Sequence, residues 1–309
     1  MTDRTTGAFL HAVSWLIRLL PAALFGPAAG LLAHLRGVTP RDVRLMRQNL
    51  AVVLGLAPGS REARDLEWRC VRHQIVAALE TVRISFDRKR LNVASMDGFD
   101  ELGQLMAEVE GHGRGQVLVT GHLGAWELLA QSTVCASSSP VCAVAKPSRA
   151  RAASAFVERM RARAGVRVIW SGRASLLRDM LSCLKRRETL IMVVDQRPDQ
   201  RRGPEVDFLG RRTEFVGGPA ALAAKRDCPL IAAFCIREGP FSYRLESEML
   251  RRPGGSRDPV ELSQRIASAI ERRVRARPEQ WMWNYRRWNY DAEELAAVGL
   301  GRTDSGQAV

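Results

Sequence analysis

The sequence predicts an α/β protein in which a mostly parallel sheet is flanked by helices. Two observations support this prediction. Upstream of residue 112, apolar residues recur at helical spacing, whereas from residue 116 onward short apolar runs typical of buried strands alternate with helical patterns. This alternation indicates parallel strands joined by helical crossovers. We therefore divide the chain into an N-terminal helical region (1–111), an α/β domain (112–290) and a C-terminal tail (291–309).

The most apolar stretch of the chain lies at residues 8–35. Arg18 interrupts it and Pro21 follows, which disfavours one clean membrane-spanning helix. Three interpretations stay open: an interfacial or re-entrant anchor, one imperfect span, or a buried helical hairpin. Several arginines follow between residues 36 and 47, and a basic run beside an apolar anchor suits the anionic cytoplasmic leaflet of a membrane.

Three further helices are predicted before the sheet, at residues 40–56, 61–84 and 99–111. The turn at residues 58–60 separates the first two, and Ser60 is a suitable N-cap for the second. These helices complete the N-terminal helical region.

Six apolar runs predict the strands of the sheet, at residues 116–120, 140–145, 166–170, 189–194, 229–236 and 241–249. Helical patterns occupy residues 124–136, 151–164, 174–187, 217–227 and 259–276. A loop rich in Arg, Gly and Pro is expected at 197–205. In sheets of this class the chemistry occurs at the carboxyl ends of the strands, so the residues that directly follow each run are the candidates for function.

The composition excludes several classes of protein. With 309 residues, 46% of them hydrophobic, the chain can bury a core without disulfides or metals and is not disordered. None of its six cysteines shows CxxC spacing, which argues against a zinc ribbon or thioredoxin-type site and favours buried, reduced thiols in the cytosol. The net charge of +14 predicts an anionic partner, such as phosphate groups, nucleic acid, an acidic carrier protein or lipid headgroups. A GC-rich genome would give the same arginine bias, and this alternative stays open.

A histidine and a carboxylate follow the first predicted strand, in the sequence Gly121-His122-Leu123-Gly124-Ala125-Trp126-Glu127. If Glu127 accepts a hydrogen bond from one ring nitrogen of His122, the other nitrogen is left as a base. The motif contains no serine or cysteine nucleophile, so the attacking group would be a hydroxyl of the substrate. The helix N-terminus offers N–H donors to a developing oxyanion. Short motifs also match by chance, and in the alternative His122 only caps the helix while Glu127 is solvated.

Several motifs in order resemble one family. The spacing of His122 and Glu127 resembles the Hxxxx(D/E) signature of membrane glycerolipid and lipid A acyltransferases. More specifically, nearly the whole chain resembles the bacterial lipid A late acyltransferases, whose mycobacterial relatives acylate phosphatidylinositol mannosides. The other matching elements are Arg47-Gln48-Asn49-Leu50, Lys146-Pro147, Arg161 before Gly165, Asp195-Gln196, Val206 to Gly210, and Pro278 to Trp283 with Arg286-Arg287-Trp288. Ser148 to Arg151 and Asn284-Tyr285 depart from the family pattern, and these departures bear on the acceptor rather than on the type of reaction.

The resemblance implies direct transfer of a fatty acyl group from acyl-acyl carrier protein or acyl-CoA to a hydroxyl of a phosphorylated glycolipid. A lipid A precursor is the first expectation, and a phosphatidylinositol mannoside or a lysophospholipid is the alternative acceptor. His122 would be the general base, oriented by Glu127. Arg161 would anchor the substrate electrostatically, and Asp195 would position it. Gln196, Lys146 and Arg197 would contact substrate, as would Arg201 and Arg202.

No clustered His/Cys/Asp set with ligand spacing appears in the sequence, so we expect no metal, no other cofactor and no nucleic acid. The resemblance also implies a place on inner-membrane lipid at the cytoplasmic face of the bacterial inner membrane. Three alternatives accompany these roles. Arg161 and Asp195 would instead form a fold-stabilising ion pair, and the basic side chains would be solvated. The tryptophans at 281, 283 and 288 border the bilayer or pack the last helix onto the sheet.

The rival from another class is a non-enzymatic protein that binds nucleic acid or an anionic membrane. The net charge supports it, but the basic residues are spread along the chain and no motif interleaves them with aromatics. The ordered motifs favour the acyltransferase.

Overall fold

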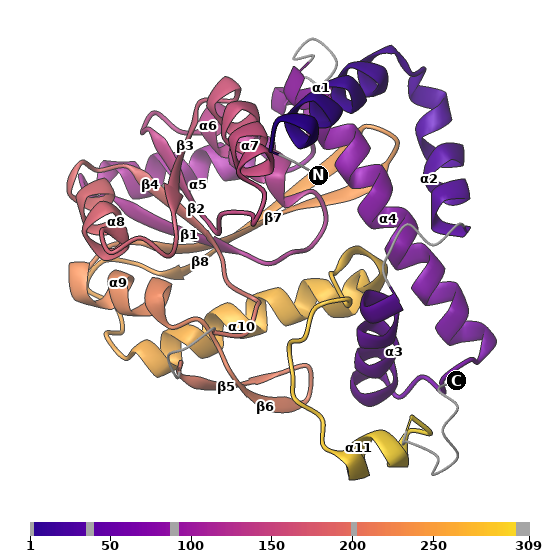
Figure 1. The fold of residues 1–309 in the computed structure, drawn as a ribbon. Helices are drawn as coiled ribbons and strands as arrows, with labels where there is room; N and C mark the ends of the chain where they lie inside the picture. The colour runs from indigo at the N-terminus through magenta and orange to yellow at the C-terminus, as the bar shows by residue number, and fades with distance from the viewer. Residues whose placement is uncertain (1–2, 35–39, 87–92, 199–202, 301–309) are drawn as a thin grey trace.

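The computed structural model describes residues 3–34, 40–86, 93–198 and 203–300. It confirms an α/β architecture built on a mostly parallel sheet with helices on both faces (Figure 1). The N-terminal helices are α1 (Asp3–Leu19), α2 (Phe25–His34), α3 (Pro40–Leu54), α4 (Arg61–Phe86) and α5 (Phe99–Gly111), with 3₁₀ turns η1 (Ala22–Leu24) and η3 (Val93–Ser95).

Within the described residues, six strands form the main sheet in the order β3-β2-β4-β1-β7-β8. They are β1 (Gln116–Thr120), β2 (Val141–Ala145), β3 (Val166–Trp170), β4 (Thr189–Val193), β7 (Leu230–Gly239) and β8 (Ser242–Arg251). The first five run parallel, and β8 returns antiparallel to β7. Strand β1 lies between β4 and β7, and each of its five residues is buried, as its apolar run predicted.

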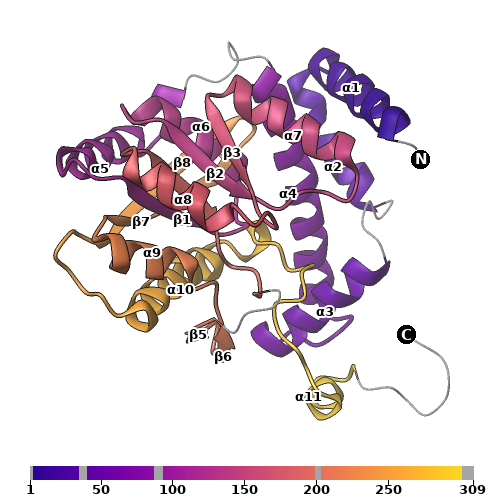
Figure 2. The ribbon, with the colours of Figure 1, turned by 60° about the vertical axis from the view of Figure 1, so that its left-hand side comes forward.

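The crossover helices cover both faces of the sheet. They are α6 (Trp126–Ala136), α7 (Arg151–Arg163), α8 (Leu176–Lys185), α9 (Gly218–Arg226) and α10 (Pro259–Ala276), followed by η4 (Pro278–Gln280) and α11 (Ala292–Ala297). Because side chains alternate along a strand, Leu118 packs with α5 and α6 on one face, while Val117 and Val119 pack with α8, α9 and α10 on the other. The result is a three-layer arrangement with β1 at its centre (Figure 2).

Two elements lie outside the sequence prediction. A separate antiparallel hairpin, β5 (Glu205–Phe208) and β6 (Arg211–Glu214), follows the predicted loop. Its strands have only four residues each and β6 is mostly charged, so it leaves no apolar run to detect. Helix α11 occupies part of the expected tail, where Asp291 and Glu294 form a capping box. The division of the chain at residues 111 and 290 stays a prediction.

The N-terminal helices pack on the rest of the protein but leave an apolar face exposed. The buried guanidinium of Arg83 in α4 donates hydrogen bonds to the carbonyls of Ile17 and Leu20, at 2.8 and 3.3 Å, and so satisfies the C-terminal end of α1. In the described residues, no single helix is long and apolar enough to cross a bilayer. The segments 5–19 and 22–34 meet that requirement only together, and they bend by 112° between them.

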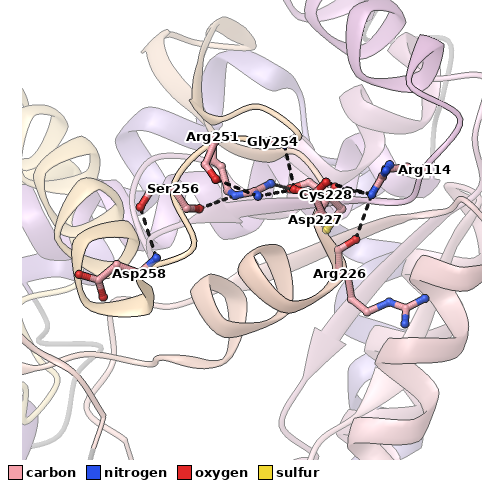
Figure 3. Close-up of polar contacts among 9 residues, drawn as sticks. Arg114, Arg226, Asp227, Cys228, Arg251, Gly254, Ser256 and Asp258 are labelled. Atoms are coloured by element: carbon pink, nitrogen blue, oxygen red, sulfur yellow. Dashed lines mark hydrogen bonds and ion pairs between the residues drawn. The ribbon is translucent and has the colours of Figure 1, made fainter.

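At the sheet edge where β1 and β7 begin and β8 ends, a buried arginine joins the ends of several elements (Figure 3). Arg251 donates to Asp227 Oδ1 at 2.5 Å, to the Cys228 carbonyl at 2.9 Å and to the Ser256 carbonyl at 2.7 Å. Arg114, just before β1, donates to the Asp227 carbonyl at 3.0 Å. Hydrogen bonding from Arg251 lowers the pKa of Asp227 to about 2. This network fixes the edge of the sheet opposite to the carboxyl ends of its parallel strands.

We expect Arg251→Met to lower the free energy of unfolding by about 2 kcal/mol, because it removes the arginine donor of the Cys228 and Ser256 carbonyls and one of the donors to Asp227, which keeps Gly254 N–H and Arg114. The neighbouring Arg252→Met serves as the control, since Arg252 is exposed and its partner Glu108 is also exposed. The free energy of unfolding of Arg252→Met should differ from that of the wild type by no more than about 0.5 kcal/mol. Urea unfolding at neutral pH measures both. Equal stability of the two variants would contradict this assignment.

Candidate active site

The turn between β1 and α6 is held in place by its backbone. Ala125 N–H donates to the carbonyl of Cys235 in β7 at 2.8 Å, and Gly124 N–H donates to the carbonyl of Gln280 at 3.0 Å. Gly124 has φ of +61°, and a Cβ atom there would lie 2.2 Å from the Cys235 oxygen, so only glycine fits. The turn therefore presents His122 at the carboxyl end of β1 in one fixed backbone conformation.

The ring of His122 is oriented by Asp195. His122 Nδ1 lies 2.7 Å from Asp195 Oδ1, and the His122 backbone N–H donates to Oδ2 at 2.7 Å. Trp281 Nε1 donates to the same Oδ2, also at 2.7 Å. Asp195 is only 2% exposed and follows β4, the neighbour of β1 in the sheet. Two adjacent parallel strands thus bring the histidine and the carboxylate together.

The two groups set each other's charge. Burial opposes the charged form of His122, but the facing Asp195 carboxylate outweighs burial and raises the pKa of His122 above 6.5. Burial would raise the pKa of Asp195, yet His122 and the N–H donors hold it below its ordinary value. A proton on Nδ1, shared with Asp195, leaves Nε2 as the basic nitrogen.

The basic nitrogen of His122 has a loose contact that a substrate hydroxyl can displace. Gln196 Nε2 lies 3.4 Å from His122 Nε2, beyond the usual length of a strong hydrogen bond. The ring of Trp126 meets the imidazole edge-on, with 5.3 Å between the ring centroids. Gln196 is thus brought into contact with the histidine.

The contact expected between Glu127 and His122 is not the one the structure shows. Glu127 lies in the first turn of α6 and is held by Arg161 of α7, through Nε to Oε2 at 2.9 Å and Nη2 to Oε1 at 2.5 Å. The physical reason is the strand order: β4 places Asp195 next to His122, while α7 places a guanidinium next to Glu127. Glu127 still contributes to the raised pKa of His122 through its charge. The alternative ion pair between Arg161 and Asp195 is not formed.

Two of the remaining predicted residues follow strands at the same edge of the sheet. Lys146 directly follows β2 and Arg197 lies shortly after β4, and both are exposed. Arg201 and Arg202 lie outside the described residues. Lys146 and Arg197 are therefore near the carboxyl ends of the strands.

The interpretation of the C-terminal tryptophans as a bilayer border is wrong, and the packing alternative is correct. Trp281, Trp283 and Trp288 are buried and belong to the main core. Phe208 of β5 packs against both Trp281 and Trp288. The contact of Trp281 with Asp195 was not predicted, because nothing in the local sequence connects positions 86 residues apart.

One group of side chains has the composition of a metal site. Ligand atoms of Cys142, Cys183 and Glu188 lie within 4.8 Å of one another, at the edge of the sheet opposite to His122. However, Arg186 Nε donates to Glu188 Oε1 at 2.7 Å, and Arg167 donates to Oε2. These guanidinium groups compete with a cation for the carboxylate, so we assign no metal there. Five of the six cysteines are buried, as predicted, and Cys135 is exposed.

A cavity of about 330 Å³ lies apart from the histidine, between the β7–β8 hairpin and α10. Its basic side chains are engaged: Arg272 and Arg273 pair with Glu246 and Glu248 on β8. We place the active site at His122, where a base, its carboxylate and a second anchored ion pair converge, rather than at this cavity.

A dyad of histidine and aspartate at the carboxyl edge of a parallel sheet, beside an anchored arginine, is suited to activating a hydroxyl group. The chain matches bacterial lipid A biosynthesis acyltransferases over residues 2–290 and belongs to this family. It is similar to the phosphatidylinositol mannoside acyltransferase of Mycobacterium tuberculosis (strain ATCC 25618 / H37Rv), with 25% identity over 96% of this chain and 93% of the relative. It is equally similar, at 25% identity over 94% of each chain, to the protein of that name from Mycolicibacterium smegmatis. The protein is thus an acyltransferase, as the motifs predicted.

We expect Asp195→Asn to lower the pKa of His122 by at least about 1 unit, because the charge that outweighs burial is removed. The pKa of His122 is raised in the folded state, so protonating this ring stabilises the fold. That contribution is fully present below pH 6.5 and is lost as the pH rises through the folded value. NMR titration of ¹³C-labelled histidines measures the pKa, with His122→Gln identifying the signal. An unchanged pKa would contradict the assigned contact.

Proposed function

We propose that this acyltransferase moves a fatty acyl group from a thioester to a hydroxyl of a phosphorylated glycolipid, with His122 as general base. The pairing of His122 Nδ1 with Asp195 carries the proposal, because it leaves Nε2 free to accept a proton at the edge of the sheet. Among the described residues, no serine or cysteine side chain forms a hydrogen bond with His122. The hydroxyl that it activates therefore belongs to the substrate.

The proposed reaction is a direct transfer. His122 Nε2 takes the proton of the acceptor hydroxyl while its oxygen attacks the thioester carbonyl. The C–O ester bond forms, the C–S bond breaks, and the imidazolium returns the proton to the departing thiolate. Asp195 stabilises the imidazolium through its charge, and the N–H groups at the start of α6 are the expected donors to the oxyanion.

Arg161 and Glu127 form the second part of the site. Their two-point pairing fixes the guanidinium, and Nη1 of Arg161 is buried without a hydrogen-bond partner among the described residues. A buried guanidinium N–H without an acceptor is costly unless a ligand supplies one. We assign Nη1 to an oxygen of the substrate, such as a phosphate or the thioester carbonyl, with Glu127 holding the arginine rather than the histidine.

The names of the relatives support the proposed class of acceptor. Both full-length relatives carry the name phosphatidylinositol mannoside acyltransferase, so a mannosylated phosphoinositide is the first candidate acceptor. A lipid A precursor is the second candidate, favoured by the name of the family. Both are phosphorylated glycolipids, which suits the net charge of +14. The donor is an acyl-CoA or an acyl-acyl carrier protein, whose phosphate or acidic groups exposed Lys146 and Arg197 can meet.

We further propose that α1 and α2 lie on the cytoplasmic face of the inner membrane. Seven large apolar side chains are exposed on this pair and its connection: Phe9, Trp15, Leu16, Leu19, Leu24, Leu31 and Leu32. A contiguous pair of helices with such a face favours insertion into the headgroup and acyl boundary. Helix α1 packs on α7, which carries Arg161 (Figure 2). Nε2 of His11 in α1 lies 3.0 Å from Nη2 of Arg159 in α7. This contact would bring the active site close to its lipid substrate.

The reaction is tested with purified enzyme and ¹⁴C-palmitoyl-CoA or palmitoyl-acyl carrier protein, offering mannosylated phosphatidylinositol, a lipid A precursor or a lysophospholipid. We expect transfer to a phosphorylated glycolipid and a loss of about 10³-fold in kcat for His122→Ala. The control is His112→Ala, because His112 is exposed after α5, and its activity should be unchanged. Full activity of His122→Ala, or transfer to lysophospholipid alone, would contradict the proposal.

The membrane contact is tested by flotation with vesicles of phosphatidylglycerol and phosphatidylethanolamine. Changing Leu16, Leu19 and Leu31 to Ser should weaken binding at least about tenfold, since each buried leucine contributes roughly 1.5 kcal/mol or more. Leu177→Ser with Val260→Ser is the control, because these side chains are equally exposed but lie on α8 and α10. Equal losses in both variants would contradict a contact specific to α1 and α2.

A further inference from the structure

The Asp195 carboxylate receives three N–H donors, and one of them comes from a distant part of the chain. Oδ1 faces His122 Nδ1, while Oδ2 accepts from the His122 backbone and from the indole of Trp281, each at 2.7 Å. The two donors on Oδ2 leave Oδ1 directed at the imidazole. Since the carboxylate is buried, water cannot replace an N–H donor that is lost.

We propose that Trp281 is a positioning residue, which holds the Asp195 carboxylate in the orientation and charge that the base His122 requires. The inference rests on the proposed role of His122 as base. Trp281 does not act on the substrate; it acts through Asp195, and its indole N–H is the group that matters.

The indole ring is fixed by its neighbours. Trp281 is 3% exposed and packs edge-on against Trp283, with 4.6 Å between centroids, and against Phe208 at 5.8 Å and Trp288 at 6.0 Å. The buried guanidinium of Arg287 lies over two of these rings, 5.6 Å from the centroid of Phe208 and 5.8 Å from that of Trp288. A ring enclosed in this way cannot turn its N–H elsewhere without disturbing the core.

The backbone around Trp281 is bound to the catalytic turn itself. Trp281 and Leu123 form an antiparallel bridge, and the N–H of Met282 donates to the carbonyl of His122 at 3.2 Å. Together with the bond from Gly124 N–H to the Gln280 carbonyl, residues 280–282 contact the turn on both sides of Leu123, directly after the His122 side chain. The segment that supplies the indole therefore also holds the histidine's backbone.

Helix α3 secures this segment from the other end of the sequence. The buried amide of Asn49 donates to the carbonyls of Trp283 and Tyr285, at 2.6 and 2.9 Å, and accepts from the hydroxyl of Tyr290 at 2.8 Å. One side chain thus forms hydrogen bonds with three residues of the segment 283–290, which is neither helix nor strand. This accounts for two of the family-like motifs, at residues 47–50 and 278–283, as parts of one support for Asp195.

The charged groups around His122 determine the direction of the expected effect. They are Asp195 after β4 and Glu127 of α6, which pairs with Arg161 of α7. The guanidinium of Arg287 in the C-terminal segment interacts with Asp195. His73 of α4 lies near the backbone of Gly124, and burial lowers its pKa to about 4. Removing the indole N–H leaves the Asp195 charge less well satisfied, so the carboxylate binds the imidazolium more strongly. The pKa of His122 should then rise.

The test replaces Trp281 by Phe in the full-length protein, and Trp283 by Phe as the matched control. Trp283 is as buried and lies in the same segment, but its indole donates to the carbonyl of Pro278 rather than to a carboxylate. Two readouts are compared: the NMR titration of ¹³C-labelled His122, and the pH profile of kcat/KM for acyl transfer. The first needs no activity, so it distinguishes failure of this inference from failure of the proposed function.

For Trp281→Phe we expect the pKa of His122 and the acid limb of kcat/KM to move up together by about 0.5–1 pH unit. We also expect kcat to fall about tenfold with little change in KM. Trp283→Phe should leave the pKa of His122 and the pH of the acid limb of kcat/KM unchanged, even if it lowers stability. If Trp281→Phe unfolds the protein, benzothienylalanine at position 281, which replaces the N–H by sulfur in a ring of nearly the same shape, gives the same comparison. An unmoved pKa with the N–H removed, or an equal shift in the Trp283 variant, would overturn the inference.

Discussion

The contact between His122 Nδ1 and Asp195 Oδ1 is the interaction on which the rest of the site depends. It fixes the tautomer of the histidine, and it places a buried negative charge where an imidazolium will form. A buried carboxylate is costly unless donors surround it, and here three N–H groups do so. The strand order supplies this arrangement, because β4 and β1 are neighbours and both end at the same edge. The opposite edge, held by Arg251 and Asp227, keeps the strands in register without taking part in the chemistry.

The proposed active site unites parts of the chain that are far apart in sequence. The base comes from the start of the α/β domain, its carboxylate from 73 residues later, and the third donor from the C-terminal segment. Asn49 of the N-terminal helices in turn holds that segment. Helix α1, which carries part of the exposed apolar face, packs on α7, the helix that carries Arg161. The proposed membrane contact therefore lies close to the proposed catalytic groups. A lipid enzyme that takes its acceptor from a bilayer needs this proximity.

Much of the fold and the residues of the proposed site could be predicted from the sequence, whereas the pairing of those residues could not. Apolar runs located all six strands of the main sheet. The position of His122 and Glu127 after a strand, and the family resemblance for Asp195, selected the residues of the proposed site. Local reasoning then joined His122 to Glu127, its neighbour in the motif, because sequence spacing does not reveal that β4 lies beside β1. Tryptophans are common both at a bilayer border and in a protein core. Only the packing in the structure shows that Trp281 belongs to the core. The β5–β6 hairpin escaped notice because its short, charged strands carry no periodic signal.

The most direct test of this account is a double-mutant cycle on kcat/KM between His122→Ala and Asp195→Ala, with the wild-type enzyme and the double variant completing the cycle. If Asp195 acts only through the histidine, the double variant should be no slower than His122→Ala alone, because the carboxylate has nothing left to orient. A double variant whose losses multiply would show that the two residues act independently, and would contradict the dyad.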